Sequence, residues 1–113
     1  FVKLTGVRVI IGKGGMKEYN VNLTNQFLEE LEKILYFFPN SYLYKKKLYY
    51  DIRNTVSTLS IFPERYMKLK NDKKNIRKLI VNKFIIIYKV DNINEKVYIL
   101  HIFSEKQDYY NLL

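Results

Sequence analysis

Hydrophobic and polar residues alternate early in the chain and then recur at helical spacing. Tyr19, Val21 and Leu23 alternate with asparagines, which predicts a strand with one apolar face. Apolar residues spaced three and four apart follow, and they predict a helix with one buried stripe: Phe27, Leu28, Leu31, Ile34 and Leu35. Thr24 is the predicted N-cap of this helix. Its solvent side is predicted to carry Glu29, Glu30, Glu32 and Lys33.

A second helix is predicted to follow Pro39 and Asn40, which end the first. Ser41 is its predicted cap, and its apolar stripe comprises Tyr44, Leu48, Ile52, Val56 and Leu59. Phe62-Pro63 is predicted to end it, because a proline disfavours helical geometry at the preceding residue. The two consecutive helices predict an antiparallel hairpin.

From residue 76 onward, β-branched residues predict three strands at 76–81, 84–90 and 97–103. Asn82-Lys83 is a two-residue hairpin connection, and residues 91–94 form a longer one rich in residues that tolerate positive φ. The uninterrupted apolar run at 84–88 is typical of a central strand buried on both faces. The predicted class is α+β: a strand, two helices and a three-stranded antiparallel meander, with the helical hairpin packed on one face of the sheet.

Residues 1–15 precede this pattern and end in a glycine-rich stretch before Met16. Val7, Val9 and Ile11 alternate as in a short strand. We expect residues 1–15 to be an N-terminal extension or a remnant of cloning. Residues 16–113 are then a single domain, because little chain remains to build a second core.

Composition narrows the possible settings and partners. The apolar fraction of 48% supplies a core, and a net charge of +9 predicts attraction to nucleic acid or to an acidic protein. The absence of cysteine excludes disulfides and thiolate chemistry. No apolar stretch approaches the roughly 20 residues that span a bilayer, and residues 1–15 lack the apolar segment of a signal peptide. We therefore expect a cytoplasmic protein with no membrane partner.

Basic residues are densest between residues 64 and 75. This turn contains Arg65, Lys68, Lys70, Lys73 and Lys74 against only two acidic residues. A run of this kind suits contact with phosphates, although such runs are more often simply solvated.

The element order and several motifs resemble the RelE/ParE toxin superfamily over residues 16–113. The motifs are Phe62-Pro63-Glu64-Arg65-Tyr66, the segments 76–84, 87–90 and 97–102, and Lys106-Gln107-Asp108-Tyr109. The resemblance implies a twisted antiparallel sheet with the helical hairpin on one face and a concave basic surface on the other. It also implies a type II toxin–antitoxin pair, in which a cognate antitoxin protein blocks that surface.

The resemblance implies one of two toxic activities. Members of the RelE branch enter the ribosome and cleave messenger RNA by promoting attack of a ribose 2′-hydroxyl on the adjacent phosphate. This metal-independent chemistry requires no cofactor, but it needs a proton acceptor, cations and a donor for the leaving oxygen. Members of the ParE branch inhibit DNA gyrase without a catalytic centre. A diverged toxin that acts as a nucleic-acid-binding module is a third possibility.

His101, near the end of the last strand, is the first of four candidates for catalysis. Imidazole exchanges protons close to neutral pH, which suits acid–base chemistry. By simple alternation His101 shares a face with Ile99 and Phe103, so it could equally be a half-buried strand residue. Arg77 is the second candidate, either as a planar phosphate donor or as a solvated strand charge.

The other two candidates are Arg65 and Tyr109. Arg65 could act with Glu64 or merely pair with it, and Tyr109 could stack on a base or pack against the helices. RNA contacts are predicted for six lysines: Lys68, Lys70, Lys73, Lys74, Lys78 and Lys106.

Two cations expected of a ribonuclease are missing. Many ribonuclease members carry an arginine in the central strand, where this chain has Ile85. They carry another in the last strand or its exit, where this chain has His101 or Gln107. These departures leave the gyrase-inhibiting branch open.

Overall fold

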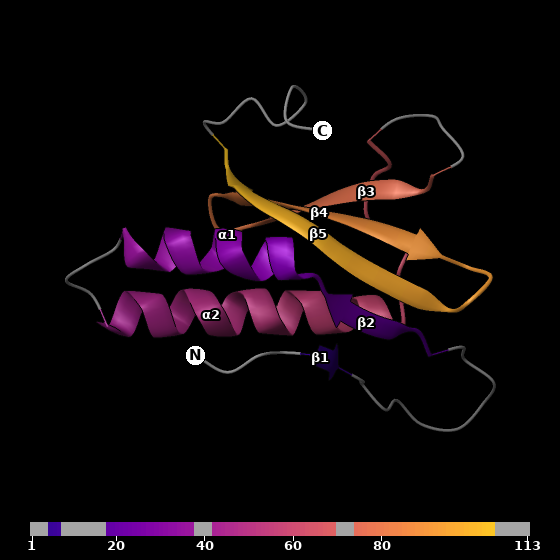
Figure 1. The fold of residues 1–113 in the computed structure, drawn as a ribbon, viewed down its shortest axis with the longest axis horizontal. Helices are drawn as coiled ribbons and strands as arrows, with labels where there is room; N and C mark the ends of the chain where they lie inside the picture. The colour runs from indigo at the N-terminus through magenta and orange to yellow at the C-terminus, as the bar shows by residue number, and fades with distance from the viewer. Residues whose placement is uncertain (1–4, 8–17, 38–41, 70–73, 106–113) are drawn as a thin grey trace.

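The computed structural model describes residues 5–7, 18–37, 42–69 and 74–105. Its elements run in the order β1 (Thr5–Val7), β2 (Asn20–Leu23), α1 (Asn25–Tyr36), α2 (Tyr42–Ser57), β3 (Ile76–Val81), β4 (Phe84–Asp91) and β5 (Lys96–Ser104). The two helices lie side by side, run in opposite directions and pack on the sheet (Figure 1). The predicted α+β class and the helical hairpin are confirmed.

Helix α1 begins as predicted. The Thr24 hydroxyl accepts a hydrogen bond from the Phe27 amide at 3.2 Å, which satisfies one of the free N–H groups of the first turn. Phe27 and Leu31 are buried in the main core, and the other three residues of the predicted stripe pack at its border. The helical spacing therefore identified the buried face of α1.

Helix α2 buries Leu48, Ile52 and Val56, whereas Tyr44 near its outer end is 39% exposed. The α-helix ends at Ser57, before the predicted Phe62-Pro63, and a 3-10 turn follows at Thr58–Ser60. In this stretch the hydroxyls of Ser57, Thr58 and Ser60 donate to carbonyls three residues earlier. Such side-chain bonds compete with the α-helical ladder and favour the tighter turn. The predicted cap Ser41 lies outside the described residues.

The sheet is mixed, not antiparallel as the family resemblance implied. Its order is β1-β2-β5-β4-β3, and β2 pairs with β5 in parallel. Only Thr24 separates β2 from α1, and α1 continues in the direction of β2 (Figure 1). Helix α2 then returns the chain to the end where β2 began. The meander starts there, so β3 and β5 both run parallel to β2.

Strand β4 is the buried centre of the meander. Its residues 84–88 are all buried, as predicted, and they divide between two clusters. Ile86 and Tyr88 join the main core under the helices. Ile85 and Ile87 form a second, smaller cluster with Phe103 on the opposite face. Each face of β4 is therefore covered by different residues.

The connections on either side of β4 are tight turns. Asn82 adopts positive φ (55°) in the two-residue hairpin before β4. In the turn after β4, positive φ falls on Glu95 (54°), one residue beyond the predicted 91–94. The Asp91 carboxylate accepts the amides of Ile93 and Asn94 and so shapes this turn.

Strand β1 pairs antiparallel with the outer edge of β2. The predicted strand around Val7 is present at Thr5–Val7, while Val9 and Ile11 lie outside the described residues. That residues 1–15 are an N-terminal extension or a remnant of cloning stays a prediction.

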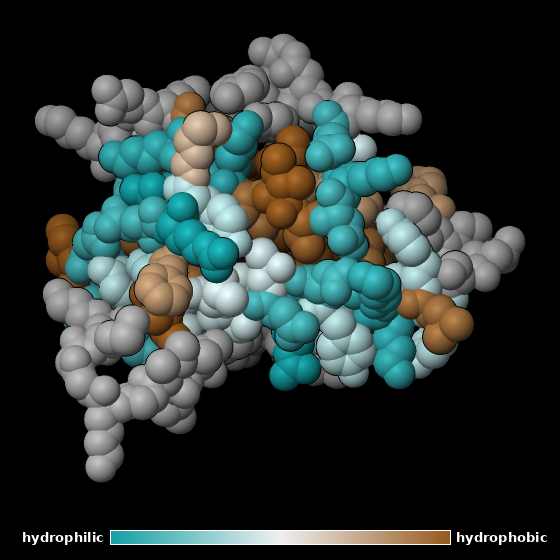
Figure 2. All heavy atoms as spheres, turned by 180° about the vertical axis from the view of Figure 1, so that it is seen from behind, coloured by the Kyte–Doolittle hydropathy of each residue, from teal (hydrophilic) through white to brown (hydrophobic). Residues whose placement is uncertain are grey.

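The outer surface combines apolar and charged areas. Seen from behind, hydrophobic surface near the centre of the molecule is bordered by hydrophilic side chains (Figure 2). None of the helices in the described ranges is long and apolar enough to cross a bilayer.

Tyr88 provides a test of the main core. Its hydroxyl donates to the Pro63 carbonyl at 2.8 Å, and burial raises the pKa of Tyr88 to about 12. The folded state favours the neutral hydroxyl of Tyr88, and this preference stabilises the fold. The stabilisation is fully present below the pKa that Tyr88 has in the unfolded chain, and it is lost as the pH rises through the pKa of Tyr88 in the folded protein. In Tyr88→Phe we expect the phenolate absorbance step near pH 12 to disappear and the melting temperature to fall by several degrees. An unchanged alkaline titration curve would contradict this placement of Tyr88.

Candidate functional site

His101 lies beside an irregularity in β5 that simple alternation does not anticipate. Ile87 of β4 is opposite His101, whereas the next residue, Tyr88, is opposite Ile99, so Leu100 is an extra residue in β5. Such a β-bulge changes which side chains share a face. Ile99 packs in the main core under the helices. The prediction that His101 shares a face with Ile99 is therefore wrong, and only its pairing with Phe103 holds.

The imidazole of His101 is held by contacts on two sides. Its ring stacks on Phe103, with centroids 5.3 Å apart and planes 16° from parallel. Its Nδ1 atom lies 3.1 Å from the Glu30 carboxylate oxygen Oε1. The same oxygen accepts the backbone amide of Ile102 at 3.3 Å. Two separate contacts therefore fix the orientation of the ring.

Glu30 reaches this position because β2 is short. β2 pairs with β5 only as far as Ile99, and the Thr24 amide bonds the Ile99 carbonyl where the pairing ends. Beyond that point α1 lies beside β5, and the Glu30 carboxylate accepts an amide that a neighbouring strand would otherwise bind. Sequence reasoning assigned Glu30 to the solvent side of α1, and that assignment is wrong. Its side chain is only 18% exposed.

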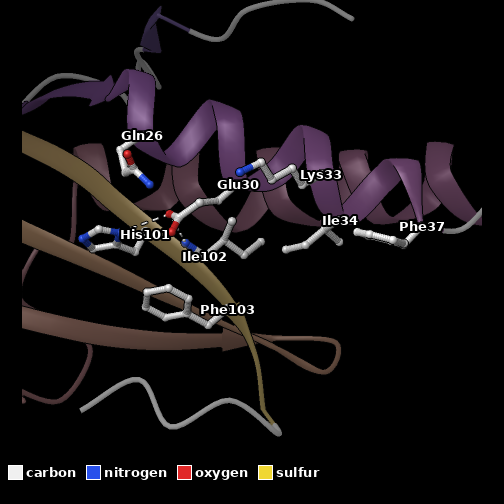
Figure 3. Close-up of a pocket in the computed structure, with 8 residues that line it drawn as sticks. All are labelled: Gln26, Glu30, Lys33, Ile34, Phe37, His101, Ile102 and Phe103. Carbon is white, nitrogen blue, oxygen red and sulfur yellow. Dashed lines mark hydrogen bonds and ion pairs between the residues drawn. The ribbon is translucent and has the colours of Figure 1, made fainter. Parts of the chain in front are cut away.

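A groove of about 520 Å³ surrounds this pair between α1 and β5 (Figure 3). Its α1 wall carries side chains along one row of the helix, and its other wall is the end of β5. The lining residues are Gln26, Glu30, Lys33, Ile34, Phe37, His101, Ile102 and Phe103. The second nitrogen of His101, Nε2, points away from Glu30 (Figure 3).

The pair of Glu30 and His101 is suited to proton transfer. A carboxylate only accepts hydrogen bonds, so it favours the tautomer with its proton on Nδ1 and a lone pair on Nε2. His101 retains 27% exposure of its side chain, so a ligand in the groove can reach the ring. Lys33, one turn beyond Glu30 on α1, adds a positive charge to the same groove. No cluster of metal-ligating side chains occurs within the described ranges.

Arg77 points to the other face of the sheet. It lies opposite Tyr88, which is in the core under the helices. Its guanidinium donates to the carbonyls of Glu64 and Tyr66 at 3.2 and 2.7 Å and to the Asn75 side chain at 2.9 Å. It also pairs with the Glu64 carboxylate at 3.1 Å and is 12% exposed. Arg77 therefore anchors the segment after α2 to β3, and phosphate binding by it stays a prediction.

Glu64 belongs to the same anchor. A hydrogen bond from the Asn75 amide and the charge of Arg77 hold the pKa of Glu64 below its usual value. The acidic residue beside Arg65 is thus engaged with Arg77. Arg65 instead lies with its guanidinium 5.4 Å from the centre of the Tyr66 ring, a cation–π distance.

Among the lysines predicted to contact RNA, Lys78 lies in the same row across the sheet as His101. Lys78 is opposite Ile87, and Ile87 is opposite His101, so the three form one row across β3, β4 and β5. Two strand spacings separate the backbones of Lys78 and His101, or about 10 Å. Ile85, at the position where many ribonuclease members carry an arginine, is buried on this same face.

The remaining predicted residues lie elsewhere or outside the described ranges. Lys68 and Lys74 are exposed beside the start of β3, and Lys68 forms an isolated bridge with Arg77. Lys70, Lys73, Lys106 and Tyr109 lie outside the described residues. Catalytic and RNA-binding roles for these side chains stay predictions.

The sequence matches the model of a known protein family. Residues 21–109 match the family described as ParE toxin of type II toxin-antitoxin system, parDE. This match spans β2 to the end of β5 and includes both walls of the groove. No curated protein sequence matches the chain.

Solved structures support the fold. The RelBE2 toxin–antitoxin complex of Mycobacterium tuberculosis is 19% identical, with a TM-score of 0.58, and the match covers 77% of this chain and 98% of that one. The chromosomal ParDE system of P. aeruginosa is 17% identical, with a TM-score of 0.62 and coverage of 78% and 97%. The archaeal RelE–RelB complex of Pyrococcus horikoshii is 14% identical, with a TM-score of 0.54 and coverage of 80% and 98%.

Proposed function

We propose that this chain, which belongs to the ParE toxin family of type II toxin–antitoxin systems within the RelE/ParE superfamily, inhibits translation by ribosome-dependent cleavage of messenger RNA. The observation that carries the proposal is the contact between Glu30 and His101, which orients an imidazole that lines an accessible groove and leaves its Nε2 free of Glu30. This arrangement supplies the proton acceptor that metal-independent RNA cleavage requires.

In the proposed reaction, Nε2 of His101 takes the proton of a ribose 2′-hydroxyl. The 2′-oxygen then forms a bond to the adjacent phosphorus, and the bond from phosphorus to the 5′-oxygen breaks. The leaving 5′-oxygen takes a proton from water, and His101 returns its own proton to solvent. The products are a 2′,3′-cyclic phosphate and a 5′-hydroxyl. Glu30 keeps the ring in the required tautomer and stabilises the imidazolium that forms.

The surroundings of the pair suit an RNA strand. Lys33 in the groove and Lys78 on the same row as His101 place positive charge on two sides of the ring. Such cations stabilise the extra charge on the phosphate in the transition state. Phe103 stacks on His101 and restricts its rotation, and Phe37 offers a further aromatic face in the groove.

A cognate antitoxin is the proposed partner that keeps the toxin inactive. The similar solved structure from M. tuberculosis is described as a toxin–antitoxin complex, and the one from P. horikoshii as a RelE–RelB complex. This chain has a net charge of +9, so an acidic antitoxin segment is electrostatically suited to cover its basic surface.

Inhibition of DNA gyrase is the second candidate, and a specific observation favours it. Arg77 is engaged with protein groups on the helix-facing side of β3, and Ile85 is buried where many ribonuclease members carry an arginine. Two cations that could assist RNA cleavage are thus unavailable or absent. A toxin that only binds its target needs neither.

The test is to express the full chain from a tight promoter and to map the 5′ ends of cellular messenger RNA. We expect discrete new ends inside translated codons for the wild type, none for His101→Gln, and wild-type ends for the exposed control Glu29→Gln. Loss of DNA supercoiling with intact messenger RNA would instead support gyrase inhibition. Expression without growth arrest, together with salt-dependent binding of naked RNA or DNA, would indicate a nucleic-acid-binding module.

A further inference from the structure

The outer end of the helical hairpin exposes an unusual set of large side chains. We define the hairpin tip as the last turn of α1 with its C-cap Phe37, together with α2 from Tyr42 to Tyr50. Its exposed apolar residues have between 39% and 78% of their surface accessible: Tyr36, Phe37, Tyr42, Leu43, Tyr44 and Tyr50. Isolated exposed apolar residues are common on proteins, but a contiguous group marks an interaction site.

A hollow of about 500 Å³ lies between the two helices at this tip. It is lined by Glu32, Leu35, Tyr36, Tyr42, Lys45, Lys46 and Tyr49. The first turn of α2 contains no acidic residue. Lys47 pairs with Asp51 at 2.7 Å, whereas Lys45 and Lys46 face the hollow, where Glu32 is the acidic residue of the lining. The aromatic surface is therefore accompanied by positive charge.

The chemistry of the tip suits a single-stranded nucleic acid. Five of its six exposed apolar side chains are aromatic, and only Leu43 is aliphatic. Aromatic rings interleaved with lysines are the features that bind unpaired bases and phosphates together, since every base presents a π-face.

The tip meets the His101 groove at Phe37. Phe37 lines the groove and Tyr36 lines the hollow, and their rings meet edge to face with centroids 5.8 Å apart. From Glu30 to Phe37 the helix axis advances about 10 Å, the length of about three nucleotides stacked at 3.4 Å. Glu32, Leu35 and Tyr36 lie about half a turn around α1 from Glu30 and Phe37, so a strand that reaches both sites has to pass around the helix.

We propose that the hairpin tip binds single-stranded RNA on one side of the cleavage position, by stacking bases on Tyr36, Phe37 and Tyr42 and by pairing phosphates with Lys45 and Lys46. This inference rests on the proposed function, because the position of the tip relative to the cleaved bond is defined only if cleavage occurs at His101. Binding at the tip is nevertheless a separate property, which can be measured without cleavage.

The experiment measures the binding of a fluorescein-labelled, uridine-rich single-stranded RNA to the full chain carrying His101→Gln, by fluorescence anisotropy. Adding Phe37→Ser or Tyr42→Ser is expected to weaken binding about tenfold each. Ile93→Ser is the matched control, since Ile93 is 92% exposed in the turn between β4 and β5. We expect the control to bind as tightly as its parent.

Charge is tested with Lys45→Gln and Lys46→Gln together, against Lys96→Gln as the control. The double variant is expected to reduce the slope of log Kd against log salt by about 1 to 2, and the control by less. Lysines near the start of a helix oppose its dipole, so the double variant should melt no lower than its parent. Weaker binding at undiminished stability separates loss of contact from loss of fold.

Each of the other possible outcomes either supports or overturns the proposal that the tip binds RNA. RNA binding that the tip variants leave unchanged overturns it, as does the absence of RNA binding by the parent chain. If the tip variants instead abolish binding of the co-expressed antitoxin and leave RNA affinity unchanged, the tip is a protein-binding surface. Tip-dependent RNA binding without messenger RNA cleavage in cells supports the tip and contradicts the proposed function.

Discussion

Replacing Arg77 by alanine is expected to lower the free energy of unfolding by about 2–4 kcal/mol. The side chain is 12% exposed and donates to two backbone carbonyls, one amide oxygen and one carboxylate. Alanine leaves these acceptors without their donor and detaches the segment after α2 from β3. The melting temperature should fall by about 4–8 °C for each kcal/mol, as measured by circular dichroism.

Two companion variants show whether Arg77 is structural. Arg77→Lys keeps the charge but not the planar fork, so it should recover only part of the lost stability. Arg53→Ala, at an exposed position of α2, should leave the melting temperature within about 1–2 °C of the wild type. If Arg77→Ala abolished toxicity while melting like the wild type, the guanidinium would have to act on a ligand instead.

Replacing His101 by glutamine is expected to slow messenger RNA cleavage by about 10²–10⁴-fold, because the reaction loses its proton acceptor. Glu30→Gln should slow it by about 10–100-fold, because an amide can present either its oxygen or its NH2 group to Nδ1 and no longer fixes the tautomer. The double variant should be no slower than His101→Gln alone, because Glu30 acts through His101. Cleavage rates in a reconstituted translation system supply all three values.

The role of Glu30 also predicts a change that a purely structural residue would not produce. The amide oxygen of Glu30→Gln can still accept the Ile102 amide, so the melting temperature should change little. The cleavage rate should fall all the same, because the glutamine amide no longer fixes the tautomer of His101. Glu29→Gln, on the exposed side of α1, should change neither quantity. Multiplicative losses in the double variant would mean that Glu30 and His101 act independently.

Hydrophobic periodicity predicted most of the fold. The boundaries of β3 match the prediction. β4 ends one residue later than predicted, and β5 is one residue longer than predicted at each end. The Thr24 cap is also as predicted. These features depend on residues close together in the sequence. The parallel pairing of β2 with β5 depends on the direction of α1 after Thr24, which no local pattern encodes.

The candidate site was predicted only in part, for a similar reason. His101 was identified by its chemistry, but its partner Glu30 was assigned to solvent. Helical spacing shows which residues face the core, and it does not show that a short β2 leaves the amide of Ile102 for α1 to satisfy. The bulge at Leu100 has no signature in the sequence, yet it decides which neighbours His101 has.

The position of β5 has a consequence for the order in which the protein acquires its structure. β5 is the last strand in the chain but lies inside the sheet, between β2 and β4. The hydrogen bond from Thr24 to Ile99 joins residues 75 apart, whereas β3 and β4 form a local hairpin. Long-range pairing of this kind is slow compared with local contacts. During synthesis, the groove around His101 therefore forms only after β5 has emerged from the ribosome, and shorter nascent chains hold no assembled site.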